Sequence, residues 1–319
     1  MRILVTGASG FVGQGLLRRL NADGRHQVRA AVRRPIPVTG RSVECIVVGD
    51  QSTSTEWLSA LRGIDVVVAL SARVHIKEND AERQLAQCRE VNVGGTLNLA
   101  QQAVQQGVRR FVFISSIKVH GEGTVPSSTS APVPISESDR PAPEDPYGIS
   151  KHEAEQGLLQ IAASSAMEVV IIRPPLVYGH GVRANFRSLV RAVALGVPLP
   201  FGAVQNCRSL VSLDNLVDFI MCCIEHRAAA NEVFLVSDGD DISTQELIRR
   251  LGRAMGRRVW LFQIPVPLLM AGAVMLGERE KARRVLGSFQ ADISKARRLL
   301  GWKPPLTVDE GLQQAAQLS

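Results

Sequence analysis

The fold is decided near the start of the chain by Arg2-Ile3-Leu4-Val5-Thr6-Gly7-Ala8-Ser9-Gly10-Phe11-Val12-Gly13. The first five residues are mostly β-branched or apolar, which is typical of a short buried strand. The glycines then break the strand, and leucines at helical spacing follow them. A strand, a tight turn and a helix let backbone N–H groups and the positive end of a helix approach a pyrophosphate. We predict that Gly7, Gly10, Phe11, Val12 and Gly13 bind a dinucleotide; the alternative is an ordinary turn before a helix.

A second strand over residues 28–32 ends in Arg33-Arg34. Chains that select NAD commonly have an acidic residue here, which accepts hydrogen bonds from the adenosine ribose. Guanidinium groups suit a phosphate monoester instead, so the pair favours NADP(H) and leaves NAD(H) possible; the alternative is a solvated basic turn. Asp50, after the third strand, is expected either to accept a hydrogen bond from the adenine amine or to cap a turn.

Strand and helix patterns alternate through the first half of the chain. Apolar runs at 3–5, 28–32, 45–48, 64–70, 111–115 and 169–172 enclose helical segments, notably 81–106. This order predicts an α/β fold, a Rossmann-type doubly wound parallel sheet whose ligands bind at the strands' carboxyl ends. Residues 121–146 carry six prolines and predict a long surface loop. We expect a dinucleotide-binding domain over 1–173 and a smaller, mainly substrate-binding lobe over 174–319, with a return strand near 233–236.

Composition excludes several classes of function. The 319 residues carry a net charge of +7, but the basic residues are dispersed without interleaved aromatics, so we expect an anionic small substrate and no nucleic acid. Five cysteines lack CxxC or Cys/His spacing, so neither a disulfide framework nor a metal site is expected. No leader segment is evident, which favours the cytoplasm. Residues 264–276 are apolar but too few to span a membrane, and predict a buried or interfacial helix.

A second segment, Tyr147-Gly148-Ile149-Ser150-Lys151, carries the candidate chemistry. On a helix, the four-residue spacing places Tyr147 and Lys151 on one face. A phenol titrates near pH 10, and a neighbouring ammonium should lower that pKa. Lys151 could also bind the nicotinamide ribose, and Ser116, after the strand at 111–115, could donate to the same substrate oxygen as Tyr147. The alternative is an exposed helix start.

The chain resembles the extended short-chain dehydrogenases/reductases of the nucleotide-sugar epimerase/dehydratase superfamily over nearly its whole length. The similarity includes the first glycine turn, Ala69-Leu70-Ser71-Ala72, Asn92-Val93-Gly94-Gly95-Thr96, the segments at Ser116 and Tyr147, Ile172-Arg173-Pro174-Pro175-Leu176-Val177, Arg208-Ser209-Leu210 and Leu300-Gly301-Trp302.

That resemblance implies an enzyme with roles for several further residues. Tyr147 would be the proton donor and acceptor, Lys151 its partner and Ser116 a ligand of the substrate oxygen. Cofactor contacts would come from Leu70, Ser71, Ala72, Asn92, Pro174 and Val177, and contacts to a UDP-sugar from Lys118, Asn185, Phe201 and Arg208. For Phe201, simple core packing is the alternative, and for Arg208 and Lys118 a surface position. Relatives often form homodimers through helices near 81–106 and 152–163; the alternative is that both helices pack inside one chain.

The residues after Ser116 discriminate between reactions. Dehydratases of this superfamily carry an acidic pair where this chain has Ile117 and Lys118, so dehydration is disfavoured. Because Arg33-Arg34 favours NADP(H), we predict reduction of the C4 ketone of a UDP-linked 4-keto-6-deoxy-N-acetylhexosamine, a step of bacterial surface polysaccharide (O-antigen) synthesis by resemblance. The alternatives are a UDP-hexose or UDP-N-acetylhexosamine 4-epimerase with tightly bound NAD, and a dinucleotide-binding protein without catalysis.

Overall fold

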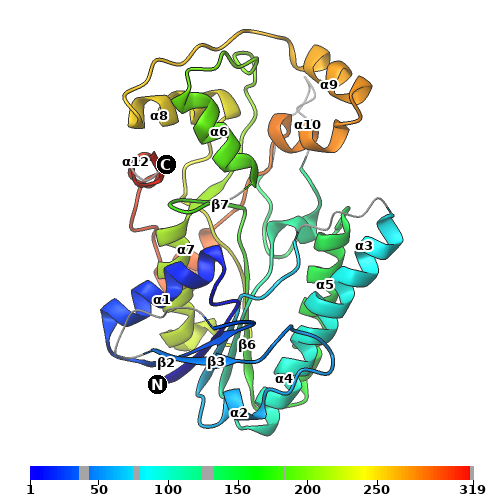
Figure 1. Ribbon diagram of the computed structural model, residues 1–319, viewed down its shortest axis with the longest axis vertical. Coiled ribbons are helices and arrows are strands. Elements are labelled where there is room, and N and C mark those ends of the chain that lie inside the picture. Colours follow the sequence, from blue (N-terminus) through cyan, green and yellow to red (C-terminus); the bar gives the residue numbers. More distant parts are fainter. Residues whose placement is uncertain (36–42, 75–79, 124–132, 183, 317–319) are drawn as a thin grey trace.

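A seven-stranded, fully parallel sheet forms the centre of the computed structural model, which describes residues 1–35, 43–74, 80–123, 133–182 and 184–316, without the side chains of 184 and 185 (Figure 1). The strand order is β3-β2-β1-β4-β5-β6-β9. The strands are β1 (Arg2–Thr6), β2 (Gln27–Val32), β3 (Val43–Val47), β4 (Val66–Ala69), β5 (Arg110–Ile114), β6 (Glu168–Arg173) and β9 (Val233–Leu235). The predicted Rossmann-type α/β fold is confirmed, including the return strand after residue 232.

Both faces of the sheet are covered by helices, which explains why three successive residues of β1, Ile3, Leu4 and Val5, are apolar and buried. Ile3 and Val5 pack into one core with α1 (Phe11–Asp23) and α7 (Leu213–Glu225), whereas Leu4 packs into the opposite core. The opposite core contains α2 (Leu58–Leu61), α4 (Gly95–Gln105) and α5 (Pro146–Ala163). Successive side chains of a strand point to opposite faces, so a strand buried on both sides needs apolar residues at every position.

The helical segment expected at 81–106 is present but is wound unevenly. It consists of α3 (Ala81–Cys88), the π-helical segment η1 (Arg89–Gly94) and α4. Single π-helical turns inside helices are frequent at functional sites. Both α3 and α4 pack against α5, so the two segments expected at a dimer interface lie side by side in one chain. A homodimer through them stays a prediction.

The residues after β6 build a second core beside the carboxyl ends of the strands. A small parallel pair, β7 (Leu176–Tyr178) and β8 (Leu210–Ser212), was not expected from the sequence. It packs with α6 (Ala184–Ala194), α8 (Thr244–Ala254) and α12 (Val308–Ala316). Part of this half returns to the sheet, because β9 pairs with β6, α7 covers the face that carries α1, and α11 (Ser294–Leu300) packs on β9. The domain boundary at residue 173 stays a prediction.

The apolar segment at 264–276 forms α9 (Val266–Met275), followed by α10 (Arg279–Leu286). None of the α9 residues is buried, so the expectation of a buried helix is wrong. The alternative, a helix at an interface, stays a prediction. Among the described residues, no helix is both long and apolar enough to cross a membrane. The predicted loop at 121–146 contains no helix or strand at residues 121–123 and 133–145, and residues 124–132 lie outside the described part.

Candidate active site

The glycine turn between β1 and α1 is enforced by close packing. Gly7 has φ = +63°, and a Cβ there would lie 2.8 Å from the backbone of Leu70 and Ser71 at the end of β4. A Cβ on Gly13 would lie 2.3 Å from the Gly7 carbonyl oxygen. The Gly10 amide donates to the same carbonyl at 2.8 Å, and Gly10, which has no side chain, caps α1. The first amides of α1 therefore face outward without a capping side chain, a geometry that fits an anion such as a pyrophosphate.

A small pocket opens at this helix start. It is lined by Ser9, Gly10, Phe11, Gln14, Arg18, His180 and Gly181. The turn thus brings the predicted residues Gly10 and Phe11 to a concave surface beside the loop that follows β7. Val12 lies in the first turn of α1 and packs against the core under the sheet.

The ends of β2 and β3 present opposite charges to solvent. Arg33 and Arg34 are exposed, and Arg33 Nη1 lies 3.4 Å from Asp50 Oδ1. The carboxylate of Asp50 therefore offsets part of the positive charge of Arg33, which was predicted to bind a phosphate monoester. The predicted contact of Asp50 with adenine stays a prediction.

Asn92 connects the loop after β4 to the helix that carries Tyr147. It is fully buried in η1; its Oδ1 accepts from the Arg73 amide at 2.8 Å, and its Nδ2 donates to the Arg73 carbonyl and to Ser150 Oγ at 2.9 Å. These bonds satisfy the amide group inside the chain. Asn92 therefore ties the loop after β4 to α5, and its predicted contact with the cofactor stays a prediction. Leu70, Ser71 and Ala72 are half-buried at the same sheet edge.

Tyr147 and Lys151 lie on one face of α5, as the spacing predicts. Asp145 caps the helix by accepting from the Gly148 amide at 2.7 Å, and Pro146 occupies its first turn. The Lys151 side chain is 1% exposed; its Nζ donates to the Ile114 carbonyl at 2.7 Å and lies 5.9 Å from the centre of the Tyr147 ring. Ile114 ends β5 two residues before Ser116, so all three predicted catalytic residues gather at the carboxyl end of this strand.

The electrostatics of the pair differ from the sequence-based expectation. Burial lowers the pKa of Lys151 to about 7, against the opposing influence of Glu155. Burial also raises the pKa of Tyr147 above that of a free phenol, and the charges of Asp145 and Cys88 raise it further. The predicted lowering of the Tyr147 pKa is wrong for this state, because an ammonium that is itself buried loses much of its charge near neutral pH.

A buried network fixes the middle of α5. Arg173, at the end of β6, donates to both Glu155 oxygens at 3.0 and 2.6 Å, and its Nη1 lies 2.9 Å from His120 Nε2. Burial and the adjacent Arg173 charge lower the pKa of His120 to about 4, so its ring is neutral and Nε2 accepts this hydrogen bond. Glu155 and His120 were not predicted as part of the site. The signal in the sequence was Arg173, a charged residue that follows four apolar residues at the end of β6.

A second network joins η2 (Ile117–His120), α5 and α10. Lys118 Nζ lies 2.5 Å from Glu122 Oε1 and also bonds Asp145 Oδ2, and Arg284 Nη2 lies 3.1 and 3.4 Å from the same two carboxylates. Burial opposes ionisation of Asp145, but the charge of Lys118 and the Gly148 amide hold its pKa below the usual range. Lys118 is therefore ion-paired within the chain, which neither predicted alternative included. Ser116 Oγ accepts from the Lys118 amide at 3.2 Å.

The predicted substrate residues are less closely gathered. Arg208 is half-buried, its Nη1 donates to the Gly287 carbonyl at 2.9 Å, and burial lowers its pKa. Phe201 is half-buried against the core of the second lobe, which supports the packing alternative. Asn185 lies in the first turn of α6, but its side chain lies outside the described part of the structure.

Pro174 and Val177, the two predicted cofactor contacts after β6, lie where the chain passes from the sheet into the second lobe. The Pro174 carbonyl accepts from the Ile117 amide at 3.0 Å, and Val177 is a half-buried residue of β7.

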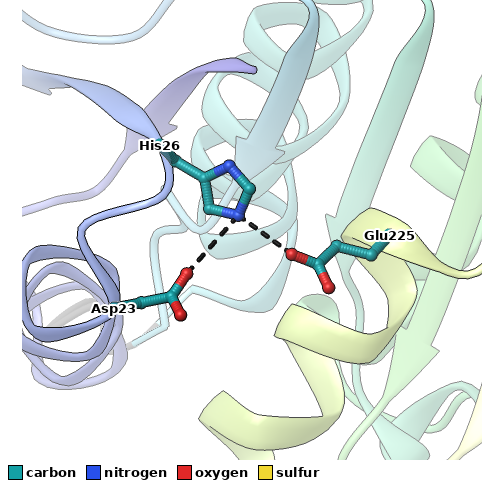
Figure 2. Close-up of side chains that lie close together, drawn as sticks. All are labelled: Asp23, His26 and Glu225. Carbon is teal, nitrogen blue, oxygen red and sulfur yellow. Dashed lines mark hydrogen bonds and ion pairs between the residues drawn. The ribbon is translucent and has the colours of Figure 1, made fainter.

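A separate cluster of Asp23, His26 and Glu225 lies where α1, β2 and α7 meet (Figure 2). His26 Nε2 lies 2.9 Å from Glu225 Oε1 and 3.6 Å from Asp23 Oδ2. Arg25 also contacts both carboxylates, at 2.8 Å for Asp23 and 3.2 Å for Glu225. A cation of the chain thus already pairs with both carboxylates of this group, which joins α1 to α7 at a distance from the candidate active site.

Comparison with known proteins identifies the family. The model of the NAD dependent epimerase/dehydratase family matches residues 3–237. The chain belongs to this family, and it is an enzyme of that class. It is 47% identical to a UDP-glucose 4-epimerase of Vibrio cholerae over 316 residues, which cover 99% of this chain and 94% of the relative.

Other relatives differ in their reactions. The GDP-6-deoxy-D-mannose reductase of Pseudomonas aeruginosa is 29% identical over 98% of this chain and 95% of its own length. A solved structure of MoeE5 in complex with UDP-glucuronic acid and NAD has a TM-score of 0.79 and 28% identity, covering 100% of this chain and 98% of that chain. Structural neighbours therefore bind NAD and UDP-sugars, whereas the predicted preference for NADP(H) has no support among them.

Proposed function

We propose that this protein is a UDP-hexose 4-epimerase that uses NAD. The observation that carries the proposal is the arrangement of Tyr147 and Lys151 on one face of α5, next to Ser116 at the end of β5. The relative at 47% identity over nearly the whole chain supports epimerisation in particular. This proposal corresponds to the alternative of our sequence analysis and replaces ketone reduction as the leading hypothesis.

The residues of the turn after β1 fit a dinucleotide. Gly7, Gly10 and Phe11 would hold its pyrophosphate on the open amides of α1, and Arg33 would lie toward the adenosine end. When bound, a nicotinamide ring accepts and returns a hydride at a carbon that bears an oxygen.

The chemistry assigned to the chain itself is proton transfer at the sugar O4. Tyr147, in its phenolate form, takes the proton of the C4 hydroxyl at Oη and later returns it, and Ser116 Oγ donates a hydrogen bond to the same oxygen. Lys151 stabilises the phenolate whenever its ammonium is charged, which its pKa of about 7 permits near neutral pH. Ile117 and Lys118 offer no carboxylate for elimination of water, so the ketone formed at C4 is returned to an alcohol.

A second candidate is the 4-ketoreductase of our sequence analysis. The exposed Arg33 and Arg34 favour it, since they could bind the phosphate that distinguishes NADP(H). A family relative that is a nucleotide-sugar reductase shows that this chemistry occurs on related chains.

One experiment separates the two candidates. The purified protein is incubated with UDP-glucose, UDP-galactose and their N-acetylated forms, and separately with a UDP-4-keto-6-deoxy-N-acetylhexosamine plus NADPH or NADH. Interconversion of C4 epimers without net consumption of cofactor is the expected result. Stoichiometric oxidation of NADPH with the keto sugar, and no epimerisation, would establish the reductase instead. Binding of a dinucleotide without turnover of any of these sugars would refute both.

A further inference from the structure

An apolar and solvent-exposed segment lies in the second lobe. Residues 260–277 contain no charged side chain, and their central helix α9 buries none of its residues. Met275 and Leu276 are 87% and 80% exposed, and Leu268 is 63% exposed. Contiguous apolar surface of this kind marks an interaction site, because leaving such side chains in water has a cost that grows with their area.

The exposed apolar surface extends beyond α9 to neighbouring segments. Trp260 and Phe262, just before the helix, are both more than half exposed. Backbone hydrogen bonds of 2.9 Å join them to Leu199, in the turn after α6 where Leu195 and Val197 are also exposed. Figure 1 shows α9 and the segment leading to it at one end of the long axis, opposite the end that carries α2.

Cationic side chains flank this apolar surface. Arg257 and Arg258 precede it and Arg279 follows it, and the Arg258 guanidinium lies 4.9 Å from the centre of the Trp260 ring. Among the residues that the structure describes, none of these three arginines forms an ion pair. The nearby carboxylates have other partners, since Lys281 binds Glu278 at 2.6 Å and Arg284 lies 3.9 Å from Glu280.

We propose that the surface formed by α9, Trp260 and Phe262 docks on an anionic lipid bilayer. An apolar surface with a tryptophan and unpaired arginines at its edge matches the boundary between acyl chains and negatively charged headgroups. The ten residues of α9 extend about 15 Å, half of a hydrocarbon core of about 30 Å, so the helix lies in the interface and does not span it. A second copy of the chain fits less well, because a twofold contact through this surface would bring its own arginines together.

Docking at this surface would place the candidate active site close to the bilayer. α10 follows α9 directly, and its Arg283 and Arg284 bind Glu144 at 2.8 Å and Glu122 at 3.1 Å. These carboxylates lie beside the first turn of α5, which carries Tyr147. The proposal does not depend on which reaction the site performs.

Vesicle flotation of the full chain tests the proposal directly. The probes are vesicles of phosphatidylcholine alone and of phosphatidylcholine with phosphatidylglycerol, at low and high salt. The apolar variant is Met275→Glu/Leu276→Glu and the charge variant is Arg257→Gln/Arg258→Gln. Matched controls at the opposite end of the molecule are Leu58→Glu and Arg62→Gln, both exposed. Circular dichroism, and activity on a water-soluble UDP-sugar, verify that each variant is folded.

The expected result is salt-sensitive binding to the anionic vesicles, which both α9-side variants weaken and both controls retain. Each arginine near an anionic surface contributes about 1 kcal/mol, so the charge variant should bind about 30-fold more weakly. Absence of binding by the wild-type chain would overturn the proposal, as would unchanged binding by the apolar variant. A concentration-dependent dimer that Met275→Glu/Leu276→Glu dissociates would show that a second copy covers α9, and would overturn it too. Loss of vesicle binding with UDP-sugar activity retained separates this proposal from the proposed reaction.

Discussion

Replacing the buried Lys151 by methionine should change how the stability of the protein depends on pH. In the folded chain the Lys151 pKa is about 7, whereas an unfolded lysine titrates near 10.4. Below pH 7 both states bind the proton, and the folded state bears the full cost of a buried charge. As the pH rises from 7 toward 10.4, the unfolded state alone keeps the proton, so this cost disappears and wild-type stability rises. Between pH 6 and pH 9 the rise is about 2–3 kcal/mol, and Lys151→Met should lack it.

At pH 6, Lys151→Met changes the free energy of unfolding in two opposing ways. The variant loses the 2.7 Å hydrogen bond to the Ile114 carbonyl, which costs about 1–3 kcal/mol once that carbonyl is unpaired. It also no longer buries a charged ammonium. That burial costs the wild type about 4–5 kcal/mol, the free energy that corresponds to the difference between the folded and unfolded pKa values. Lys151→Met should therefore be more stable than wild type at pH 6 and close to it at pH 9, although it is inactive.

Urea unfolding at the two pH values measures these differences on protein freed of bound nucleotide. Lys303→Met, at an exposed position, serves as the control and should follow the wild-type pH dependence. Parallel pH dependence of wild type and Lys151→Met, or a variant that is less stable at pH 6, would refute the assignment of a buried lysine with a strongly lowered pKa.

Three further substitutions test the site and its support. Tyr147→Phe should lower kcat by about 10²- to 10⁴-fold while leaving the unfolding midpoint unchanged, because it removes the proton carrier alone. Gly13→Ala should lower both stability and dinucleotide affinity, measured by calorimetry, since its Cβ would lie 2.3 Å from the Gly7 carbonyl oxygen. Arg110→Met should destabilise the chain by about 3–5 kcal/mol in urea unfolding, because this buried guanidinium holds three carbonyls at the end of α7.

Matched controls make these expectations specific. Gly272→Ala meets no atom within 4 Å and should be neutral or stabilising by up to about 1 kcal/mol. Arg109→Met removes a half-exposed partner of Glu168 and should cost under about 1 kcal/mol. Equal effects of Arg109→Met and Arg110→Met would contradict the role of burial, and full turnover by Tyr147→Phe would contradict its role as proton carrier.

Local patterns in the sequence were sufficient for the sheet and for the pairing of Tyr147 with Lys151. The strand, glycine turn and helix at the start of the chain follow one another directly in sequence. Tyr147 and Lys151 are only four residues apart on α5. Periodicity encodes such features directly. The small β7–β8 pair escaped prediction because each strand has only three residues, too few for an alternation to be visible.

Charge pairing across the fold was not predictable in the same way. Arg284 contacts Asp145, which is 139 residues earlier in the chain, and no spacing rule connects them. The direction of the Tyr147 pKa was also wrong, since the argument used one neighbouring charge and ignored burial of both groups. For Arg33, sequence showed the guanidinium but not the Asp50 carboxylate that lies beside it.

The ties that hold α5 explain how Lys151 keeps its place although it is buried, bonds a carbonyl, and has as its neighbouring carboxylate Glu155, which already pairs with Arg173. Asp145 fixes the first turn through Lys118 and Arg284, Ser150 is bonded to Asn92, and Glu155 is held by Arg173. These contacts come from separate elements, η2, α10, η1 and β6, and they lie on either side of Tyr147 and Lys151. A helix fixed in this way keeps its lysine in place even when the side chain has lost its proton. Under the proposed function, the pair could then exchange a proton with substrate without a rearrangement of the helix, because polar contacts outside the proposed chemistry hold the helix in place.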